Sequence, residues 1–181
     1  MRELICDLFL SLDGFARGSN EQAYFGYDGP ELRQWIQSEL SQPQVILMGR
    51  NTYNSLAGIA AAAADSGSGR MDELPKLVFS NTMNGPLAWN NTQLVSGELG
   101  EQMRALKQRP GDRLRTFGSI RLVQGMLELG LVDRLRLMVF PLLLGEAGRE
   151  PIQAGLQRTI LQLTCTTVLD GRLVLLEYKQ N

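Results

Sequence analysis

The stretch Val45-Ile46-Leu47-Met48-Gly49-Arg50-Asn51-Thr52-Tyr53 decides the fold class of this chain. Its four apolar residues predict a buried strand, and the glycine and short polar residues after them predict a tight turn and a helix start. The turn offers backbone N–H groups, a cation and a hydroxyl, which are the groups that bind a phosphate. A Gly-Arg turn by itself is more often structural than functional, so the stretch needs support from the rest of the chain.

The segments around this stretch alternate between strand and helix patterns. We expect strands over residues 4–12, 76–79, 92–95, 113–117 and 132–144, and helices over residues 31–40, 51–57, 98–108 and 119–129. Two last strands, 159–169 and 172–178, flank Asp170-Gly171, which is a strong hairpin signal. This order predicts an α/β fold in one domain over residues 1–181. The expected architecture is a three-layer αβα sandwich whose mixed sheet ends in an antiparallel C-terminal hairpin.

Composition excludes several classes of function. The net charge of −1 gives no electrostatic footprint for nucleic acid. The chain has no histidine, which removes the usual general base and zinc ligand, so we expect no metal site. We find no apolar run that could span a bilayer and no signal-peptide pattern, and we expect a cytoplasmic protein without a membrane partner. Cys6 and Cys165 lie in apolar runs and are predicted to be small buried residues rather than a disulfide.

Three predicted strands end in the same kind of turn. Gly49-Arg50-Asn51-Thr52, Ser80-Asn81-Thr82 and Gly118-Ser119 each place small donors directly after a short apolar strand. In open α/β sheets, ligands bind outside the carboxyl ends of such strands. The three turns together predict a dinucleotide site, although each alone also has a structural interpretation, such as a serine N-cap at Ser119. The pattern is not the G-x-G-x-x-G fingerprint, so a classical Rossmann domain is not predicted.

These motifs resemble those of the dihydrofolate reductase-like family, and most closely the branch that contains the reductase domain of bacterial riboflavin biosynthesis. The resemblance rests on Ser11-Leu12-Asp13-Gly14-Phe15, on the three turns with their strands, and on residues 130–133 and 141–145. It covers almost the whole chain in the family's order. The resemblance implies the fold described above, NADPH as the cofactor, a small heterocyclic substrate of pterin or pyrimidine type, and pairing of two chains as a homodimer.

The resemblance also implies roles for individual residues. Gly49, Arg50 and Thr52 would hold phosphates, and Ser80 and Thr82 would meet the adenosine 2′-phosphate. The pyrophosphate would lie over the next turn and helix start, formed by Gly118, Ser119, Ile120, Arg121 and Leu122. Leu12, Asp13 and Gly14 would lie near the nicotinamide. Ile120 stands where relatives carry a glycine, and we expect its side chain to crowd the pyrophosphate.

The sequence offers two candidates for the catalytic acid. Glu31 is the nearest match to the pterin-binding carboxylate of dihydrofolate reductases, but a glutamate there also simply complements a helix N-terminus. Asp13 is the other candidate, and its alternative role is a turn aspartate that accepts backbone hydrogen bonds. Asp7 is expected to be a hydrogen-bonded strand residue. Two hypotheses follow: an NADPH-dependent reductase, such as a dihydrofolate or 5-amino-6-(5-phosphoribosylamino)uracil reductase, or a non-catalytic dimeric nucleotide-binding protein.

Overall fold

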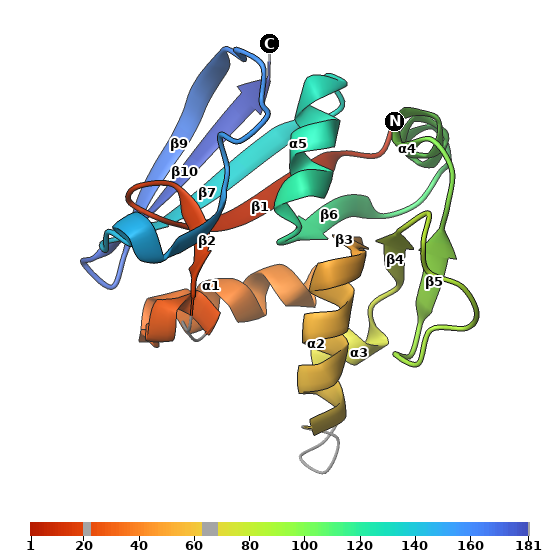
Figure 1. The fold of residues 1–181 in the computed structure, drawn as a ribbon, viewed down its shortest axis with the longest axis horizontal. Helices are drawn as coiled ribbons and strands as arrows, with labels where there is room; N and C mark the ends of the chain where they lie inside the picture. Colours follow the sequence, from red (N-terminus) through yellow and green to blue (C-terminus); the bar gives the residue numbers. More distant parts are fainter. Residues whose placement is uncertain (20–22, 63–68, 181) are drawn as a thin grey trace.

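The computed structural model describes residues 1–19, 23–62 and 69–180. Its strands are β1 (Leu4–Ser11), β2 (Phe15–Gly18), β3 (Gln44–Gly49), β4 (Lys76–Phe79), β5 (Thr92–Val95), β6 (Arg113–Phe117), β7 (Arg134–Phe140), β8 (Gly148–Pro151), β9 (Leu161–Leu169) and β10 (Leu173–Gln180). The α-helices are α1 (Pro30–Ser41), α2 (Arg50–Ala62), α3 (Arg70–Glu73), α4 (Leu99–Gln108) and α5 (Ile120–Glu128), and short 3₁₀ turns span Ala23–Gly26 and Gly145–Ala147 (Figure 1).

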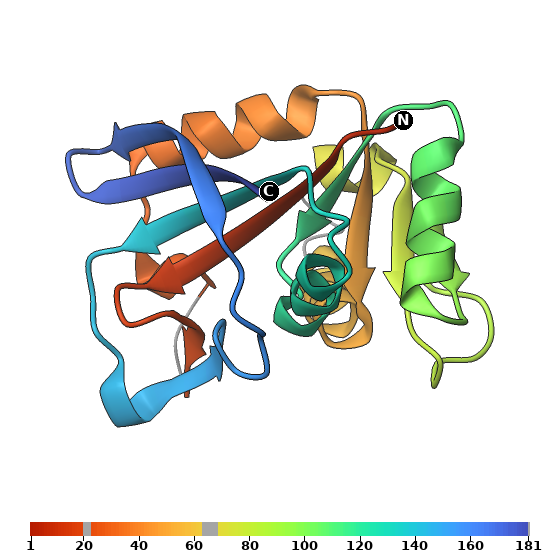
Figure 2. The same cartoon turned by 90° about the horizontal axis from the view of Figure 1, so that it is seen from above.

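The main sheet has eight strands in the order β5-β4-β3-β6-β1-β7-β10-β9. The strands from β5 to β7 pair in parallel, and β10 pairs antiparallel with both β7 and β9. Asp170 and Gly171 join β9 to β10 with φ angles of 54° and 61°, the left-handed geometry that tight hairpin turns require. The predicted mixed sheet with a C-terminal hairpin is therefore confirmed, as the view onto the sheet shows (Figure 2).

Helices cover both faces of the sheet, which confirms the three-layer sandwich. In Figure 1, α4 and α5 lie above the sheet, and α1, α2 and α3 lie below it. Side chains alternate between the two faces along β3. Leu47 packs with α4 and α5 on one face, whereas Ile46 and Met48 pack with α2 and α3 on the other. Within the described residues, no helix is long and apolar enough to cross a membrane.

Five charged residues form a cluster between the sheet and α1, which we call the buried charge cluster: Asp7, Arg115 and Arg136, which are buried, and Glu39 and Arg113, which are partly buried. Asp7 is 2% exposed, and its two carboxylate oxygens accept from Arg115 Nε and from Arg136 Nε at 2.6 Å. Arg136 Nη2 also donates to Glu39 Oε2 at 2.9 Å. Because buried charges are stable only when they are paired, this cluster accounts for the predicted hydrogen-bonded role of Asp7.

The structure corrects the sequence analysis at four places. The strand predicted over residues 132–144 stops at Phe140, directly before Pro141, whose missing N–H cannot join a strand ladder. We expected the helix after β3 to end at residue 57 and residues 60–69 to form a surface excursion, but α2 continues through the alanines to Ala62, and residues 63–68 lie outside the described part. Cys165 is exposed, because the side chains of β9 from residue 162 to 168 are exposed on both faces of the strand, while Cys6 is buried as predicted.

The fourth correction is a small second sheet that the sequence analysis missed. β2 and β8 pair antiparallel, with Arg17 opposite Arg149. They lie at the end of the main sheet to which β1 points (Figure 2). Gly148 of β8 lies so close to the Phe15 ring that a Cβ atom there would come within 2.4 Å of it. This small sheet carries part of the candidate site.

Candidate functional site

A cleft of about 960 Å³ opens at the carboxyl ends of the parallel strands. The three predicted turns meet there: the cleft is lined by Gly49, Arg50, Asn51, Thr52, Phe79, Ser80, Asn81, Thr82, Val95, Gly97, Leu99, Ser119, Ile120, Arg121, Leu122, Gln124, Glu150, Pro151 and Ala154. Most of the predicted cofactor residues are therefore brought together. Its size is that of a cofactor site, and its floor lies at the N-termini of α2 and α5.

One end of the cleft combines a cation with two hydroxyls. Arg50 is exposed at the first turn of α2, and its Nη1 donates to Thr82 Oγ1 at 2.7 Å. Ser80 Oγ accepts from the backbone N–H groups of Thr82 and Met83, both at 3.2 Å. Among the described residues, Arg50 forms no salt bridge and has the neutral hydroxyl of Thr82 as its side-chain partner, so its charge is available to an anion.

In the middle of the cleft, the hydroxyl group of Ser119 links two of the turns by hydrogen bonds. Ser119 Oγ accepts from the Gly49 N–H at 2.7 Å and donates to Thr52 Oγ1 at 2.7 Å. A Cβ atom at Gly49 would lie 3.6 Å from Ser119 Oγ, and one at Gly118 would lie 3.7 Å from Thr52 Cγ2. Both distances are ordinary van der Waals contacts, so close packing does not require the glycines here. A pyrophosphate between the N-termini of α2 and α5 fits this arrangement. Ser119 occupies the N-cap position of α5, but its hydroxyl does not cap the helix.

Ile120 lines the cleft, but it is not the turn residue whose backbone would need a glycine. The left-handed residues of this turn are Gly118 and Ser119, with φ of 67° and 69°, and Ile120 already belongs to α5. Its side chain is 6% exposed and packs in the core beneath α5, as Leu122 does at 8%. The strained backbone position is therefore Ser119. Arg121 is exposed and lines the cleft, where it adds a second cation.

The other end of the cleft comes from residues that sequence reasoning missed. Glu150 and Pro151 of β8 and Ala154 line this end together with Gln124 of α5. Gln124 Nε2 donates to the carbonyl oxygens of Ile152 and Ala154, both at 2.9 Å, and so fixes this segment against α5. No local signal marks these residues, since β8 exists only through its pairing with β2.

An aromatic wall formed by Phe9, Tyr24, Trp35 and Phe117 lies beside the end of β6. The four side chains are half-buried, and the ring centroids of Tyr24, Trp35 and Phe117 lie 5.1, 6.2 and 6.3 Å from that of Phe9. The guanidinium groups of Arg115 and Arg136 lie over the Trp35 ring at 5.6 and 5.1 Å, which joins the wall to the buried charge cluster. Such partly exposed rings can stack against a flat ligand.

Comparison with known proteins identifies the family. The family model described as the RibD C-terminal domain matches residues 2–175. The chain belongs to the RibD C-terminal domain family. A protein of Bacillus subtilis (strain 168) called uncharacterized protein YyaP is 28% identical over 185 residues, which cover 99% of this chain and 96% of that protein.

Two solved structures share the fold of this RibD-type chain. A putative riboflavin biosynthesis protein from Shewanella sp. PV-4 superposes with a TM-score of 0.79, at 22% identity, over 99% of each chain. Dihydrofolate reductase from Enterococcus faecalis, complexed with NADP(H), superposes with a TM-score of 0.65, at 11% identity, over 99% of this chain and 96% of that one. The resemblance to dihydrofolate reductase-like and riboflavin reductase-like proteins is thus confirmed at the level of fold.

In this member of the RibD C-terminal domain family, Asp13 holds a loop together. Its carboxylate accepts from Ser11 Oγ at 2.6 Å, from the Leu144 N–H at 3.0 Å and from the Gly145 N–H at 2.8 Å. The hydrogen bonds from Ser11 and from the Gly145 backbone lower the pKa of Asp13. A carboxylate held in its ionised form is a poor proton donor, so the geometry favours the turn role over an acid role.

The neighbours of Asp13 lie near the small sheet. Leu12 is 64% exposed, and its N–H donates to Leu142 O at 2.9 Å. Gly14 has φ of 83°, and its carbonyl oxygen accepts from the Ile152 N–H at 3.0 Å. Gly14 therefore lies beside the segment that follows Glu150, while Leu12 lies beside Leu142. Their predicted contact with the nicotinamide stays a prediction.

Glu31 lies at the start of α1, where it meets the β9–β10 turn. Asp170 accepts from the backbone N–H groups of Glu31 and Leu32 at 2.9 and 3.1 Å, and the Glu31 carboxylate accepts in return from the Asp170 N–H. This reciprocal arrangement caps α1 in the manner of a capping box, with the cap supplied from a distant turn. The contacts favour the structural role of Glu31. Among the described residues, no group of acidic residues and cysteines could hold a metal ion.

Proposed function

We propose that this protein is an NADPH-dependent reductase of a small, flat heterocycle of pterin or pyrimidine type. The observation that carries the proposal is the cleft in which Arg50, Ser80 and Thr82 gather at one end and two helix N-termini form the floor. This arrangement suits a dinucleotide with an extra phosphate on its adenosine ribose. Family membership and the shared fold with a dihydrofolate reductase support the same cofactor.

The residues of the cleft would bind and orient the cofactor. Arg50, with the hydroxyls of Ser80 and Thr82, would bind the 2′-phosphate, while the backbone around Gly49, Thr52 and residues 118–122 would hold the pyrophosphate. When bound, NADPH would supply the hydride, and the protein contributes the orientation of the reacting groups. The substrate would stack on the aromatic wall, whose half-buried rings offer a partly exposed apolar surface.

The second hypothesis, a nucleotide-binding protein without turnover, has a specific observation in its favour. Asp13 and Glu31 are the two candidate acids, and the carboxylate of each accepts hydrogen bonds from backbone N–H groups. A reductase of this chain would then take its proton from another donor. Binding and turnover must therefore be measured separately.

Trp35 provides a direct measurement of substrate binding. The chain has two tryptophans, and Trp89 lies in a different apolar cluster, so a Trp89→Phe background isolates the Trp35 fluorescence. We expect a pterin or an aminouracil to quench this signal in the presence of NADPH and the absorbance of reduced nicotinamide to fall. Saturable NADPH binding and quenching without cofactor oxidation would support the second hypothesis instead. Absence of NADPH binding would contradict both.

We also propose that two copies pair through β9. This edge strand carries no charged residue from 161 to 169, and Leu163 and Val168 are 51% and 58% exposed. Long edge strands without charges are sites of pairing with another chain. Light scattering should give twice the mass of one chain, and Val168→Lys should reduce that mass. A wild-type mass of one chain at all concentrations would contradict the pairing.

A further inference from the structure

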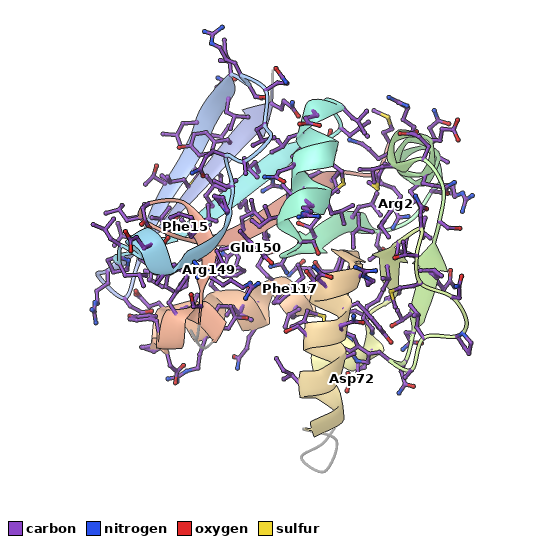
Figure 3. All side chains as sticks on the ribbon, viewed as in Figure 1. Arg2, Phe15, Asp72, Phe117, Arg149 and Glu150 are labelled. Atoms are coloured by element: carbon purple, nitrogen blue, oxygen red, sulfur yellow. The ribbon has the colours of Figure 1, made fainter. Side chains whose placement is uncertain are left out.

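Glu150 is an acidic residue at the end of the cleft that lies away from Arg50. Ser80 and Thr82 follow β4, whereas Glu150 belongs to β8, which pairs with the strand that follows β1. In Figure 3, Glu150 lies between the small sheet and the lower end of α5. Its side chain is 44% exposed, and its Oε1 lies 3.2 Å from Arg17 Nε on β2.

The backbone of Glu150 is held in a conformation that disfavours a side chain. Its φ angle is 56°, in the left-handed region, which is unfavourable for a residue other than glycine. The flanking segments explain how it persists. Gly148 packs under the Phe15 ring on one side, and on the other the Ile152 N–H donates to Gly14 O while Gln124 fixes the Ile152 carbonyl. Strained residues held in this way cluster at functional sites.

A carboxylate at this end of the cleft constrains what can lie beside it. An ionised carboxylate repels phosphates and accepts hydrogen bonds from hydroxyls. If the 2′-phosphate binds at Arg50 and the pyrophosphate binds over Gly118 and Ser119, the part of the dinucleotide that reaches Glu150 is the nicotinamide half. That half presents a ribose with two hydroxyl donors, and carboxylates bind ribose hydroxyls in other dinucleotide sites.

We propose that Glu150 binds the ribose hydroxyls of the nicotinamide half of the cofactor, and that Arg17 is the residue that positions its carboxylate. The proposal rests on the proposed dinucleotide function of the cleft. The two ends of the cleft then have different roles. Arg50 binds the phosphate that distinguishes NADPH from NADH, and Glu150 binds a ribose that both cofactors contain. The strained backbone is then the cost of placing this carboxylate at the rim.

The test compares three ligands in four variants by isothermal titration calorimetry. The ligands are NADPH, NADH and adenosine 2′,5′-bisphosphate, which lacks the nicotinamide half. We expect Glu150→Gln to weaken NADPH and NADH alike, by about tenfold, and to leave the bisphosphate unchanged. Arg17→Ala should weaken the same two ligands to a smaller degree. Glu146→Gln is the matched control, because Glu146 is an exposed carboxylate of the preceding turn that does not line the cleft. It should bind all three ligands like the wild type.

Glu150→Gly separates a binding role from a purely structural one. Glycine tolerates the left-handed backbone, so this variant should unfold at or above the wild-type temperature although it loses the Arg17 ion pair. It should nevertheless bind NADPH at least as weakly as Glu150→Gln. Unchanged NADPH affinity in both variants would overturn the inference and leave the proposed function intact. Weaker binding of the bisphosphate would also overturn it, whereas a wild-type protein that binds none of the ligands would overturn the proposed function as well.

Discussion

Arg50 and Arg136 carry the same side chain in opposite surroundings. Arg136 is 3% exposed and donates to both Asp7 and Glu39, so its charge is neutralised inside the protein. Arg50 is exposed at a helix N-terminus, and its side-chain partner is the neutral hydroxyl of Thr82. Removing a partner of Arg136 would be costly, because a buried charge would be left unpaired. Arg50 contributes little to stability and is available to an anion. The charge of the side chain that each arginine contacts therefore decides whether the arginine is available to a ligand.

Of the changes that test this comparison, Asp7→Asn should lower the free energy of unfolding the most. It leaves Arg115 and Arg136 buried with one carboxylate fewer, and breaking a buried ion pair from one side costs about 3–5 kcal/mol. We expect the free energy of unfolding in urea to fall by that amount. NADPH affinity of the folded protein should stay within about twofold, because the cluster lies beneath Trp35 and away from the cleft.

Asp28→Asn is the matched control for this loss. Its carboxylate pairs with Arg33 at 2.6 Å, and both side chains are more than half exposed. An exposed pair contributes about 0–1 kcal/mol, so this variant should unfold almost like the wild type. Equal losses in the two variants would mean that burial does not distinguish the two kinds of pair.

Glu39→Gln should have a smaller effect that depends on pH. Burial by itself would raise the pKa of Glu39, but the hydrogen bond and charge of Arg136, with the charges of Arg115 and Arg113, outweigh it and leave the pKa below its ordinary value of 4.5. A lowered carboxylate pKa contributes stability that is present above the ordinary value and lost as the pH falls through the folded value.

The variant should therefore lose about 2 kcal/mol at neutral pH. It should also show a shallower decline in the free energy of unfolding than the wild type below pH 4.5. Urea titrations across that range measure both quantities, with Glu146→Gln as the exposed control. A decline as steep as that of the wild type would show that Glu39 is not a source of the acid sensitivity.

The two arginines also differ in how far the sequence could predict them. Arg50 lies in a contiguous motif, and the strand, turn and helix around it follow from local patterns that the structure confirms. The partners of Arg136 lie on β1 and α1, 129 and 97 residues away along the chain. Such a cluster depends on strand register and helix packing, which no local pattern contains.

The same limit explains the errors at the site. The three turns were predicted because each follows its own strand. Glu150 was missed because β8 forms only against β2. The sequence also could not show which residue of the third turn takes the left-handed backbone. That residue is Ser119, whose hydroxyl is held by Gly49 and Thr52. Exposure of Cys165 likewise depends on the packing around β9, whose side chains are exposed on both faces from residue 162 to 168.

The most direct test of the central claim is the dissociation constant of NADPH and of NADH, measured for the wild type and for Arg50→Ala. We expect the substitution to change the free energy of unfolding by less than about 0.5 kcal/mol, because Arg50 is exposed. NADPH should bind at least about tenfold more weakly to the variant, and NADH should bind as before, since only NADPH carries the 2′-phosphate. An equal loss for the two cofactors, or no loss for either, would contradict the assignment of Arg50 and of this end of the cleft.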